Sequence, residues 1–365
     1  MKNKRILFIA SHRPGRAPGQ RFRFEQYFEY LGHHGFDCEL SFIISANDDK
    51  QLYLKGHYLQ KLGIHRRAVA QRKADVKRAA DFDIIFIFRE ALITGSIKFE
   101  KLFRESKAKI VFDFDDAIWK LDVSDANRRF SFLKNPAKTA EIIALSDVVF
   151  AGNAYLADYA GKFNKNIAIV PTTIDTAEYL PVNHEKDPAK IIVGWSGSIT
   201  TIKHFEFALP FLEILKNKFG DKLEIKVIGD ANYRNEKLGI KGIGWSRENE
   251  IHELSTFDIG IMPLPDDEWA NGKCGLKGLQ YMALNIPTLM SPVGVNSEIV
   301  QNGINGFLPA STEEWVTTIE TLIADPVLRI QMGKAARKTV EEKYSVNAWK
   351  GKYLELFTNL LNQTI

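Results

Sequence analysis

Short, continuously apolar runs alternate with longer stretches of mixed polarity along the chain. An apolar run that does not alternate with polar residues is typical of a strand buried on both faces of a parallel sheet. The intervening stretches are long enough for helices, so the pattern predicts an α/β fold in which helices cover both faces of parallel sheets. The predicted strands are residues 4–11, 36–44, 82–88, 109–114, 147–151, 167–171, 191–195, 223–228, 240–244, 257–262 and 286–291.

The strands fall into two series, separated by the polar, proline-flanked segment PVNHEKDP at 181–188, which is typical of a linker. We therefore expect two doubly wound domains, residues 1–183 and 184–344, and a closing helix at 345–365 that packs back on the first domain. Open sheets of this kind bind ligands beyond the carboxyl ends of their strands, which predicts a substrate in a central cleft between the domains. The other predicted helices are residues 21–34, 51–78, 204–219, 247–256, 276–284, 311–324 and 327–343.

The net charge of +4 is unevenly distributed, because the first 180 residues hold 29 Lys and Arg against 22 Asp and Glu. The segment 51–78 alone holds eight basic residues and one acid, Asp75. It is either a solvated helix face or a surface for anionic membrane lipid or a lipid-diphosphate substrate. Nucleic acid is not indicated, because no motif of a nucleic-acid-binding domain occurs.

The composition gives further expectations about location. No apolar run approaches the roughly 20 residues of a membrane span. Cys38 and Cys274 are far apart and lack the spacing of a disulfide framework or a cysteine metal site. We therefore expect a cytoplasmic protein, with peripheral contact at the inner face of the cell membrane as an additional possibility through the basic segment.

A loop rich in glycine and proline, residues 11–20, follows the first predicted strand. Its candidate site residues are His12 and Gly19, joined by Arg21 and Arg23 just beyond the loop. Backbone amides there could approach a phosphate while the arginines add positive charge. A surface turn with solvated arginines explains the same pattern.

Similar turns follow strands in the second half of the chain. The segment VGWSGS at 193–198 ends in Gly197 and Ser198 and is followed by a predicted helix near Lys203. Unpaired backbone amides and the helix dipole at such a helix start favour the binding of an anion. VIGD at 227–230 repeats the arrangement with Gly229. Trp245 is either a stacking platform for a nucleobase or a packing residue.

Residues 269–308 contain the densest group of turn glycines in the chain, beginning with the tight loop GKCG at 272–275 before a predicted helix. Two lysines at the amino end of a helix oppose its dipole, which favours an anion between them over a pair of surface lysines. The candidate anion-binding residues of this loop are Lys273, Cys274, Gly275, Leu276 and Lys277.

In their order and spacing, GWSGS, Lys203, DIGIMPL, GKCGLKGLQYMALNIPTLMSPVG, NSEIV and NGINGFL resemble the donor domain of the retaining glycosyltransferases of group 1, also called family 4. The resemblance covers residues 190–310. It implies the GT-B fold, with two Rossmann-like domains facing a central cleft. It also implies transfer from a nucleotide sugar with retention of configuration, without a protein-bound metal or other cofactor, the diphosphate being held by amides and basic residues of the C-terminal domain.

The sequence departs from this family at positions that handle the donor. Family members commonly carry two glutamates eight positions apart, and the matching positions here are Gly272 and Gln280. Gln280 can bond ribose or sugar hydroxyls but carries no charge. The family's arginine before the phosphate-binding lysine is replaced by Ser198, whereas Lys203 is retained. We expect the two lysines of GKCGLK to neutralise the diphosphate instead.

Three carboxylates lie at the end of a predicted strand in VFDFDDAIW, residues 111–119. Carboxylates crowded at a strand terminus raise one another's pKa and often mark functional sites. Asp115 and Asp116 are therefore candidates to orient the acceptor hydroxyl or to take its proton. A competing interpretation makes Asp113 and Asp115 a D-x-D metal site of the other major glycosyltransferase fold, and Asp113 could also simply cap a helix.

We expect a GT-B glycosyltransferase that transfers a sugar from a nucleotide sugar to a glycan or lipid-linked acceptor in cell-surface polysaccharide synthesis. A nucleotide-sugar epimerase of the same architecture is the first alternative. It needs titrating groups around the sugar, which the missing acids at Gly272 and Gln280 disfavour. A catalytically silent nucleotide-sugar binder is the second alternative, and the same two positions make it credible.

Overall fold

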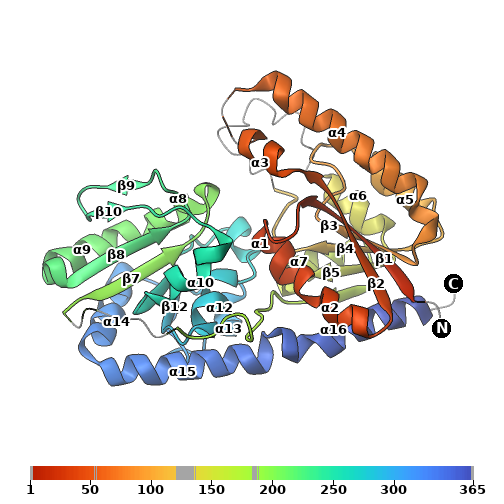
Figure 1. The fold of residues 1–365 in the computed structure, drawn as a ribbon. Helices are drawn as coiled ribbons and strands as arrows, with labels where there is room; N and C mark the ends of the chain where they lie inside the picture. Colours follow the sequence, from red (N-terminus) through yellow and green to blue (C-terminus); the bar gives the residue numbers. More distant parts are fainter. Residues whose placement is uncertain are drawn as a thin grey trace. The chain divides into compact units, whose positions relative to one another are not determined.

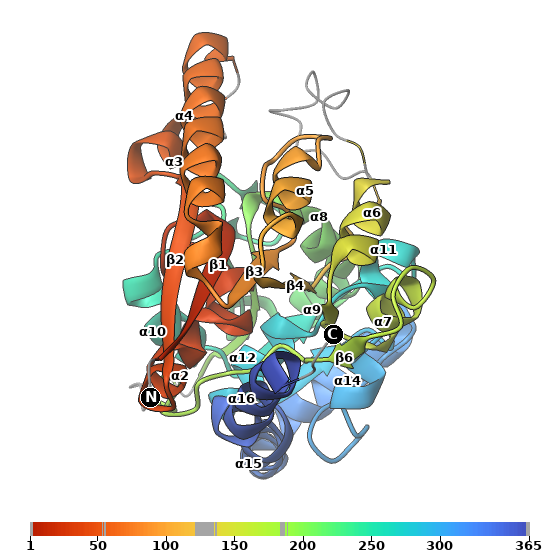
Figure 2. The same cartoon turned by 90° about the vertical axis from the view of Figure 1, so that its right-hand side faces the viewer.

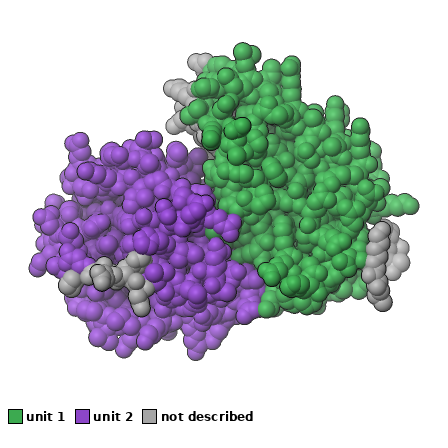
Figure 3. All heavy atoms as spheres, viewed as in Figure 1, with its two compact units in different colours: residues 1–171, 350–365 green, residues 172–349 purple. Residues whose placement is uncertain are grey.

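The computed structural model describes residues 3–52, 54, 56–120, 135, 137–182, 187 and 189–362. The chain divides into two compact units, one formed by Met1–Pro171 with Lys350–Ile365 and the other by Thr172–Trp349 (Figure 3). These boundaries differ from the expected ones at 183/184 and 344/345. Residues 183–186 and 188 of the predicted linker lie outside the described part of the chain.

The first unit is built on a six-stranded parallel sheet in the order β2-β1-β3-β4-β5-β6 (Figure 1). In β1, Ile6 pairs with Cys38 on one side and Ile84 on the other, so the strand order reverses beside this strand. Open sheets bind their ligands at such a reversal. The strands are β1 (Lys4–His12), β2 (Phe36–Ile44), β3 (Ile84–Phe88), β4 (Lys109–Phe114), β5 (Val148–Ala151) and β6 (Ile167–Ile169).

The helix predicted at 21–34 is interrupted in the structure. It consists of α1, a 3₁₀ turn at Glu25–Tyr27 and α2, because the backbone of Phe24 leaves the helical region at φ −141°. The segment predicted at 51–78 is the end of α3 followed by α4, part of which stands clear of the sheet in Figure 2. The helices of this unit are α1 (Pro18–Arg23), α2 (Phe28–His33), α3 (Ala46–Leu52), α4 (Tyr58–Lys77), α5 (Lys98–Arg104), α6 (Lys138–Leu145) and α7 (Ala154–Ala160).

Aromatic side chains from distant parts of the sequence form the core of the first unit. Phe357 of α16 (Val346–Asn362) lies 6.4 Å from the ring of Phe8 and 5.8 Å from that of Phe150, between ring centroids. Tyr353 and Phe357 are both almost fully buried. The last turns of α16 therefore complete the core beneath the sheet of this unit.

The second unit is built on a four-stranded parallel sheet in the order β12-β11-β7-β8. A short antiparallel pair, β9 with β10, follows β8. The strand predicted at 240–244 is shorter than expected, although Ile243 still forms a parallel bridge with Ile228, and β9 was not predicted. The strands are β7 (Ile191–Ser196), β8 (Leu223–Ile228), β9 (Arg234–Asn235), β10 (Ile240–Lys241), β11 (Ile259–Met262) and β12 (Thr288–Met290).

The closing helices of the second unit begin at side-chain caps. The Ser311 hydroxyl accepts from the backbone N–H of Glu314, and Asp325 accepts from Leu328 ahead of a helix that starts at a proline. No described helix has both the length and the apolar composition to cross a membrane. The helices are α8 (Ile202–Phe205), α9 (Leu209–Phe219), α10 (Arg247–Ser255), α11 (Glu268–Asn271), α12 (Leu276–Ala283), α13 (Asn296–Ile299), α14 (Thr312–Ala324) and α15 (Pro326–Lys343). The predicted α/β fold class is confirmed.

Candidate functional site

Two glycine loops meet at the carboxyl ends of β7 and β8. Gly197 donates its backbone N–H to the carbonyl oxygen of Ile228 at 2.9 Å. Gly229 has a φ of +132°, and a Cβ at this position would lie 2.4 Å from the carbonyl oxygen of Gly197. A side chain at position 229 would push the loops apart, so this pair of turns depends on glycine.

Ser198 begins the helical segment that carries Lys203. Its backbone N–H donates to the Thr201 hydroxyl at 2.9 Å, in a capping box that starts the 3₁₀ turn Ile199–Thr201. The amide that was expected to face an anion is therefore bonded within its own turn. Lys203 follows immediately, as the second residue of α8.

Three lysines act on the imidazole of His204, which is only 4% exposed. Burial is the main cause that lowers the pKa of His204 to about 4, so the ring is neutral at pH 7. The charges of Lys277, Lys273 and Lys203 lower this pKa as well. All three predicted phosphate-binding lysines therefore act electrostatically on the same buried ring.

Helix α12 starts at a left-handed glycine. Gly275 has a φ of +69°, and a Cβ there would lie 2.4 Å from Cδ1 of Ile299. Leu276 is the first helical residue, and Cys274 just before the cap is buried, with its Sγ 3.9 Å from the carbonyl oxygen of Gly272. A residue with a side chain at position 275 would therefore be strained by its backbone and would collide with Ile299.

Aromatic rings lie beside two of these lysines. The Lys273 ammonium is 5.0 Å from the ring centre of Trp269, and the Lys277 ammonium is 5.6 Å from that of Trp195. Cation–π contacts of this length contribute about 0.5–1 kcal/mol at exposed sites. The two lysines flank the start of α12, where the helix dipole is positive: Lys273 precedes the helix and Lys277 lies in its first turn.

Trp245 and Gln280 are joined by a chain of hydrogen bonds. The indole N–H of Trp245 donates to Glu250 at 2.8 Å, and the same carboxylate accepts from the Tyr179 hydroxyl at 2.5 Å. The Gln280 amide nitrogen lies 3.1 Å from that hydroxyl. Glu250 and Tyr179 were not identified from the sequence, since neither lies in a glycine loop or matches the motifs of the resembled family.

In the first unit, Asp115 and Asp116 share one arginine. Arg89, directly after β3, donates to Asp115 at 2.7 Å and to Asp116 at 3.0 Å. Its φ of +62° is unusual for a residue with a side chain and indicates a backbone held in place by its surroundings. A Cβ on Gly19 would lie 2.9 Å from Asp115, so the first loop approaches the same carboxylates.

The two arginines that were predicted to bind an anion in the first unit, Arg21 and Arg23, are buried. Arg23 is 2% exposed and bonds both carboxylate oxygens of Asp113, and it also donates to the carbonyl oxygen of Val170. Arg21 is likewise buried, with its guanidinium over the ring of Phe22. Neither arginine lies at the surface where an added anion would meet it, contrary to what the loop pattern suggested.

The buried pair of Arg23 and Asp113 also bears on the D-x-D interpretation. Burial raises the pKa of Asp113, while the guanidinium of Arg23 opposes that shift. With both oxygens bonded to Arg23, this carboxylate is a structural partner rather than an open metal ligand or a helix cap. Among the described residues, no group of three His, Cys, Asp or Glu side chains is arranged to hold a metal ion.

His12 ends the first strand, and its side chain is largely buried. Burial is the main cause that lowers its pKa to about 4, and Arg16, Arg13 and Arg89 lower it as well, whereas Asp49 raises it. Arg13 and Arg16 both donate to Asp49, at 2.9 Å and 2.5 Å. The ring is therefore neutral at pH 7, which disfavours His12 as a positive contact for a phosphate.

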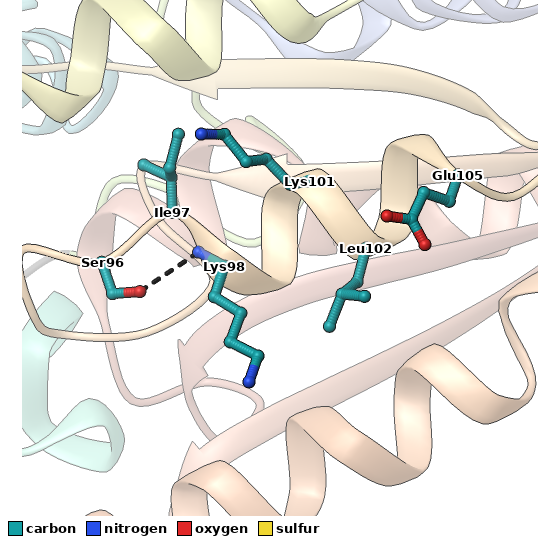
Figure 4. Close-up of a pocket in the computed structure, with 6 residues that line it drawn as sticks. All are labelled: Ser96, Ile97, Lys98, Lys101, Leu102 and Glu105. Atoms are coloured by element: carbon teal, nitrogen blue, oxygen red, sulfur yellow. Dashed lines mark hydrogen bonds between the residues drawn. The ribbon is translucent and has the colours of Figure 1, made fainter.

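A surface hollow of about 400 Å³ lies on α5 of the first unit, outside the predicted sites (Figure 4). All its lining residues come from one segment, and the Ser96 hydroxyl accepts from the backbone N–H of Lys98. Because a single helix and its approach line the hollow, polar groups do not converge there, and we assign it no role. The lining residues are Ser96, Ile97, Lys98, Lys101, Leu102 and Glu105.

Comparisons with known proteins agree with this geometry. Residues 190–325 match the family described as Glycosyl transferases group 1. D-inositol 3-phosphate glycosyltransferase of Pseudarthrobacter chlorophenolicus is 23% identical over 206 residues, which cover 50% of this chain and 48% of that protein. The alignment thus spans about half the length of this relative.

Solved structures resemble the whole chain. Sucrose-phosphate synthase of Thermosynechococcus elongatus gives a TM-score of 0.73 at 15% identity, covering 99% of this chain and 100% of that one. Anabaena HepE, solved with UDP and glucose, gives 0.65 at 15% identity, covering 98% and 99%. These likenesses show the two-domain GT-B fold. Residues 190–325, less than half of the chain, are similar to the group 1 glycosyltransferases.

Proposed function

We propose that the protein transfers a sugar from a nucleoside-diphosphate sugar to a hydroxyl of a glycan or lipid-linked acceptor. The observation that carries the proposal is that the charges of Lys203, Lys273 and Lys277 all act on the buried, neutral ring of His204. Cations gathered at the amino end of a helix repel one another and oppose its dipole, and a diphosphate between them offsets both costs. The group 1 match over these same residues supports a nucleotide sugar as the source of that diphosphate.

The lysines suit the charge that this reaction develops. The bond between the anomeric carbon and a diphosphate oxygen breaks, the acceptor oxygen bonds to that carbon, and the acceptor proton leaves to the diphosphate. Negative charge grows on the departing diphosphate, where preorganised cations stabilise the transition state. We infer from the family that configuration is retained, and that the lysines perform the neutralisation that a metal ion performs elsewhere.

Asp115 and Asp116 are proposed to orient the acceptor hydroxyl. Arg89 donates a hydrogen bond to each of the two carboxylates and so fixes both at the carboxyl end of β4. Because Arg89 holds both side chains in place, their carboxylate oxygens are oriented to accept a hydrogen bond from a hydroxyl of the sugar acceptor. We therefore assign these residues a positioning role.

Helix α4 is proposed to contact an anionic membrane. Leu59 is 82% exposed and Leu62 is 47% exposed on a helix whose basic residues include Lys61, Arg66 and Lys73. Exposed leucines beside basic residues favour the interface of an anionic bilayer. Not all basic residues of the segment contribute, because Arg72 is buried and bonded to Asp75. Such contact would bring the enzyme to a lipid-linked acceptor and to the site of polysaccharide synthesis.

Nucleotide binding tests the proposal directly. Thermal shifts with UDP, GDP, ADP, CMP and dTDP identify the base, since a ligand that binds the folded state raises the melting temperature. UDP is the first choice because HepE was solved with it. The double variant Lys273→Ala with Lys277→Ala should weaken binding at least about tenfold, which corresponds to about 1.4 kcal/mol.

The matched control changes two exposed lysines of α15, Lys334→Ala with Lys338→Ala, and should leave affinity unchanged. Equal affinities of all three proteins would overturn the role of the lysines. The absence of any thermal shift with all five nucleotides would count against the proposed donor. Release of an epimerised nucleotide sugar without an acceptor would instead favour the epimerase, and binding without turnover would favour a silent binder.

A further inference from the structure

A single phenol lies between a carboxylate and an amide in the second unit. The Tyr179 hydroxyl is 2.5 Å from Oε2 of Glu250 and 3.1 Å from Nε2 of Gln280. Tyr179 is fully buried, and the other two side chains are 7% and 5% exposed. Because a carboxylate only accepts and a phenol has one proton, that proton is donated to Glu250. Gln280 must then present its NH₂ group to the phenol oxygen.

This bonding fixes the orientation of the Gln280 amide. With Nε2 turned towards Tyr179, the carbonyl Oε1 points the other way, and no group among the described residues donates to it. An amide oxygen held in this way is an acceptor for a hydroxyl. The other oxygen of Glu250 accepts from the indole of Trp245, so one buried carboxylate orients both side chains.

The backbone around this network is anchored by one guanidinium. Arg337 of α15 donates to the carbonyl oxygen of Tyr179 at 2.8 Å and to that of Thr176 at 3.1 Å. The same group donates to the carbonyl oxygen of Ala283 at the end of α12, the helix that carries Gln280. The phenol and the amide are therefore held in register by a shared contact.

We propose that Glu250 and Tyr179 are positioning residues that lock Gln280 as the acceptor of a hydroxyl of the bound nucleotide sugar. The proposal rests on the proposed function, because it takes a nucleotide sugar as the ligand. It explains why a neutral amide stands where the resembled family carries a glutamate. The one proton of the Tyr179 phenol is already donated to Glu250. A carboxylate at position 280 would receive no hydrogen bond from Tyr179 and would be repelled by the charge of Glu250.

A charge exchange tests this arrangement. Gln280→Glu places two carboxylates on one phenol, and Glu250→Gln leaves two amides there and frees Gln280 to flip. Each single variant should weaken ligand binding about tenfold, the effect of one lost buried hydrogen bond. The double variant Glu250→Gln with Gln280→Glu restores one carboxylate and one amide around Tyr179, and should bind within about threefold of the wild type.

The probes are UDP and UDP-glucose, measured by calorimetry on the full chain. A loss with both probes assigns the hydroxyl to the ribose, and a loss with UDP-glucose alone assigns it to the sugar. Both outcomes support the proposal. A double variant that binds no better than its weaker parent contradicts it, as do single variants that bind like the wild type.

Two further measurements separate positioning from general damage. In Gln280→Glu, the carboxylate pair raises the pKa of one member, so affinity should recover as the pH falls from 8 to 6, and a merely structural defect would not recover. The melting temperatures of the wild type, the two single variants and the double variant without ligand measure the interaction between positions 250 and 280 independently of any nucleotide. If the wild type binds neither probe but another nucleotide of the thermal-shift screen raises its melting temperature, the proposed donor stands and that nucleotide and its sugar conjugate replace the probes. A wild type that binds none of the five nucleotides refutes the proposed donor and with it the ligand role of Gln280. Restored stability in the double variant would then show that the network itself is correctly described.

Discussion

Acidification should remove stability that depends on the neutral ring of His204. In the folded protein the pKa of this group is lowered from 6.5 to about 4, chiefly by burial and further by the three lysines, against the opposing charge of Asp267. The unfolded chain keeps the ordinary value. Because the folded pKa is the lower one, the unfolded state binds more protons between pH 4 and 6.5. Stability is therefore complete above pH 6.5 and falls as the pH falls towards 4.

The size of the effect follows from the shift. A lowering from 6.5 to about 4 corresponds to about 3 kcal/mol when the titration is complete, and to about 2 kcal/mol at pH 5. His204 is 4% exposed, so little of this is lost to solvent screening. A bound nucleoside diphosphate should reverse part of the loss, because its negative charge favours the imidazolium that the lysines disfavour.

The assay compares wild type with His204→Gln, which cannot titrate. Urea unfolding at pH 7.5 and 5 gives the loss of the free energy of unfolding on acidification for each protein. The difference between the two losses is due to His204, because the contribution of His12 in the first unit is common to both proteins. The variant should lose about 2 kcal/mol less than the wild type on acidification. Equal losses, or an imidazole pKa at or above 6 by NMR titration, would refute the environment described for this ring.

Two further predictions concern the glycine loop and the basic helix. Gly229→Ala should lower the free energy of unfolding by several kcal/mol, because position 229 combines a φ of +132° with a Cβ placed 2.4 Å from a carbonyl oxygen. Gly220→Ala, at a φ of +56° and a ψ of −129° with open space around it, should cost about 1–3 kcal/mol from the backbone alone and less than Gly229→Ala, and equal losses in the two melting curves would contradict the packing argument. The double variant Leu59→Glu with Leu62→Glu should reduce co-sedimentation with phosphatidylglycerol vesicles at least about fivefold. The exposed Ile330→Glu serves as its control, and a wild type that ignores such vesicles would end the membrane proposal.

The sequence predicted most of the fold because buried parallel strands are apolar on both faces. The run at 4–11 is β1, whose residues Ile6 to Ala10 are all fully buried, and the run at 223–228 coincides with β8. β9 has two residues with no apolar period, so no pattern could indicate it. The boundaries between the two units were not predicted correctly. They depend on contacts that α16 makes with residues far away in the sequence, and such contacts cannot be predicted from local composition.

Residues of the candidate site could be predicted from the sequence where they belong to a local motif. The glycines of both loops and the lysines on either side of the start of α12 are recognisable from their neighbours in the sequence. The carboxylate of Glu250 and the hydroxyl of Tyr179 are not, because they meet Gln280 only after three separate segments have packed. Arg23 illustrates the opposite error, since a loop arginine that looked available for a ligand is bonded inside the unit to Asp113.

The division of the chain has a consequence for folding during synthesis. The second unit is continuous from Thr172 to Trp349, whereas the first is made of the two ends of the chain. Its core needs Tyr353 and Phe357, which leave the ribosome after every residue of the second unit. Although domains generally fold in order from the amino terminus, here the unit that is begun first is finished last. Its sheet, still without the covering helix α16, must stay soluble while the other unit is made.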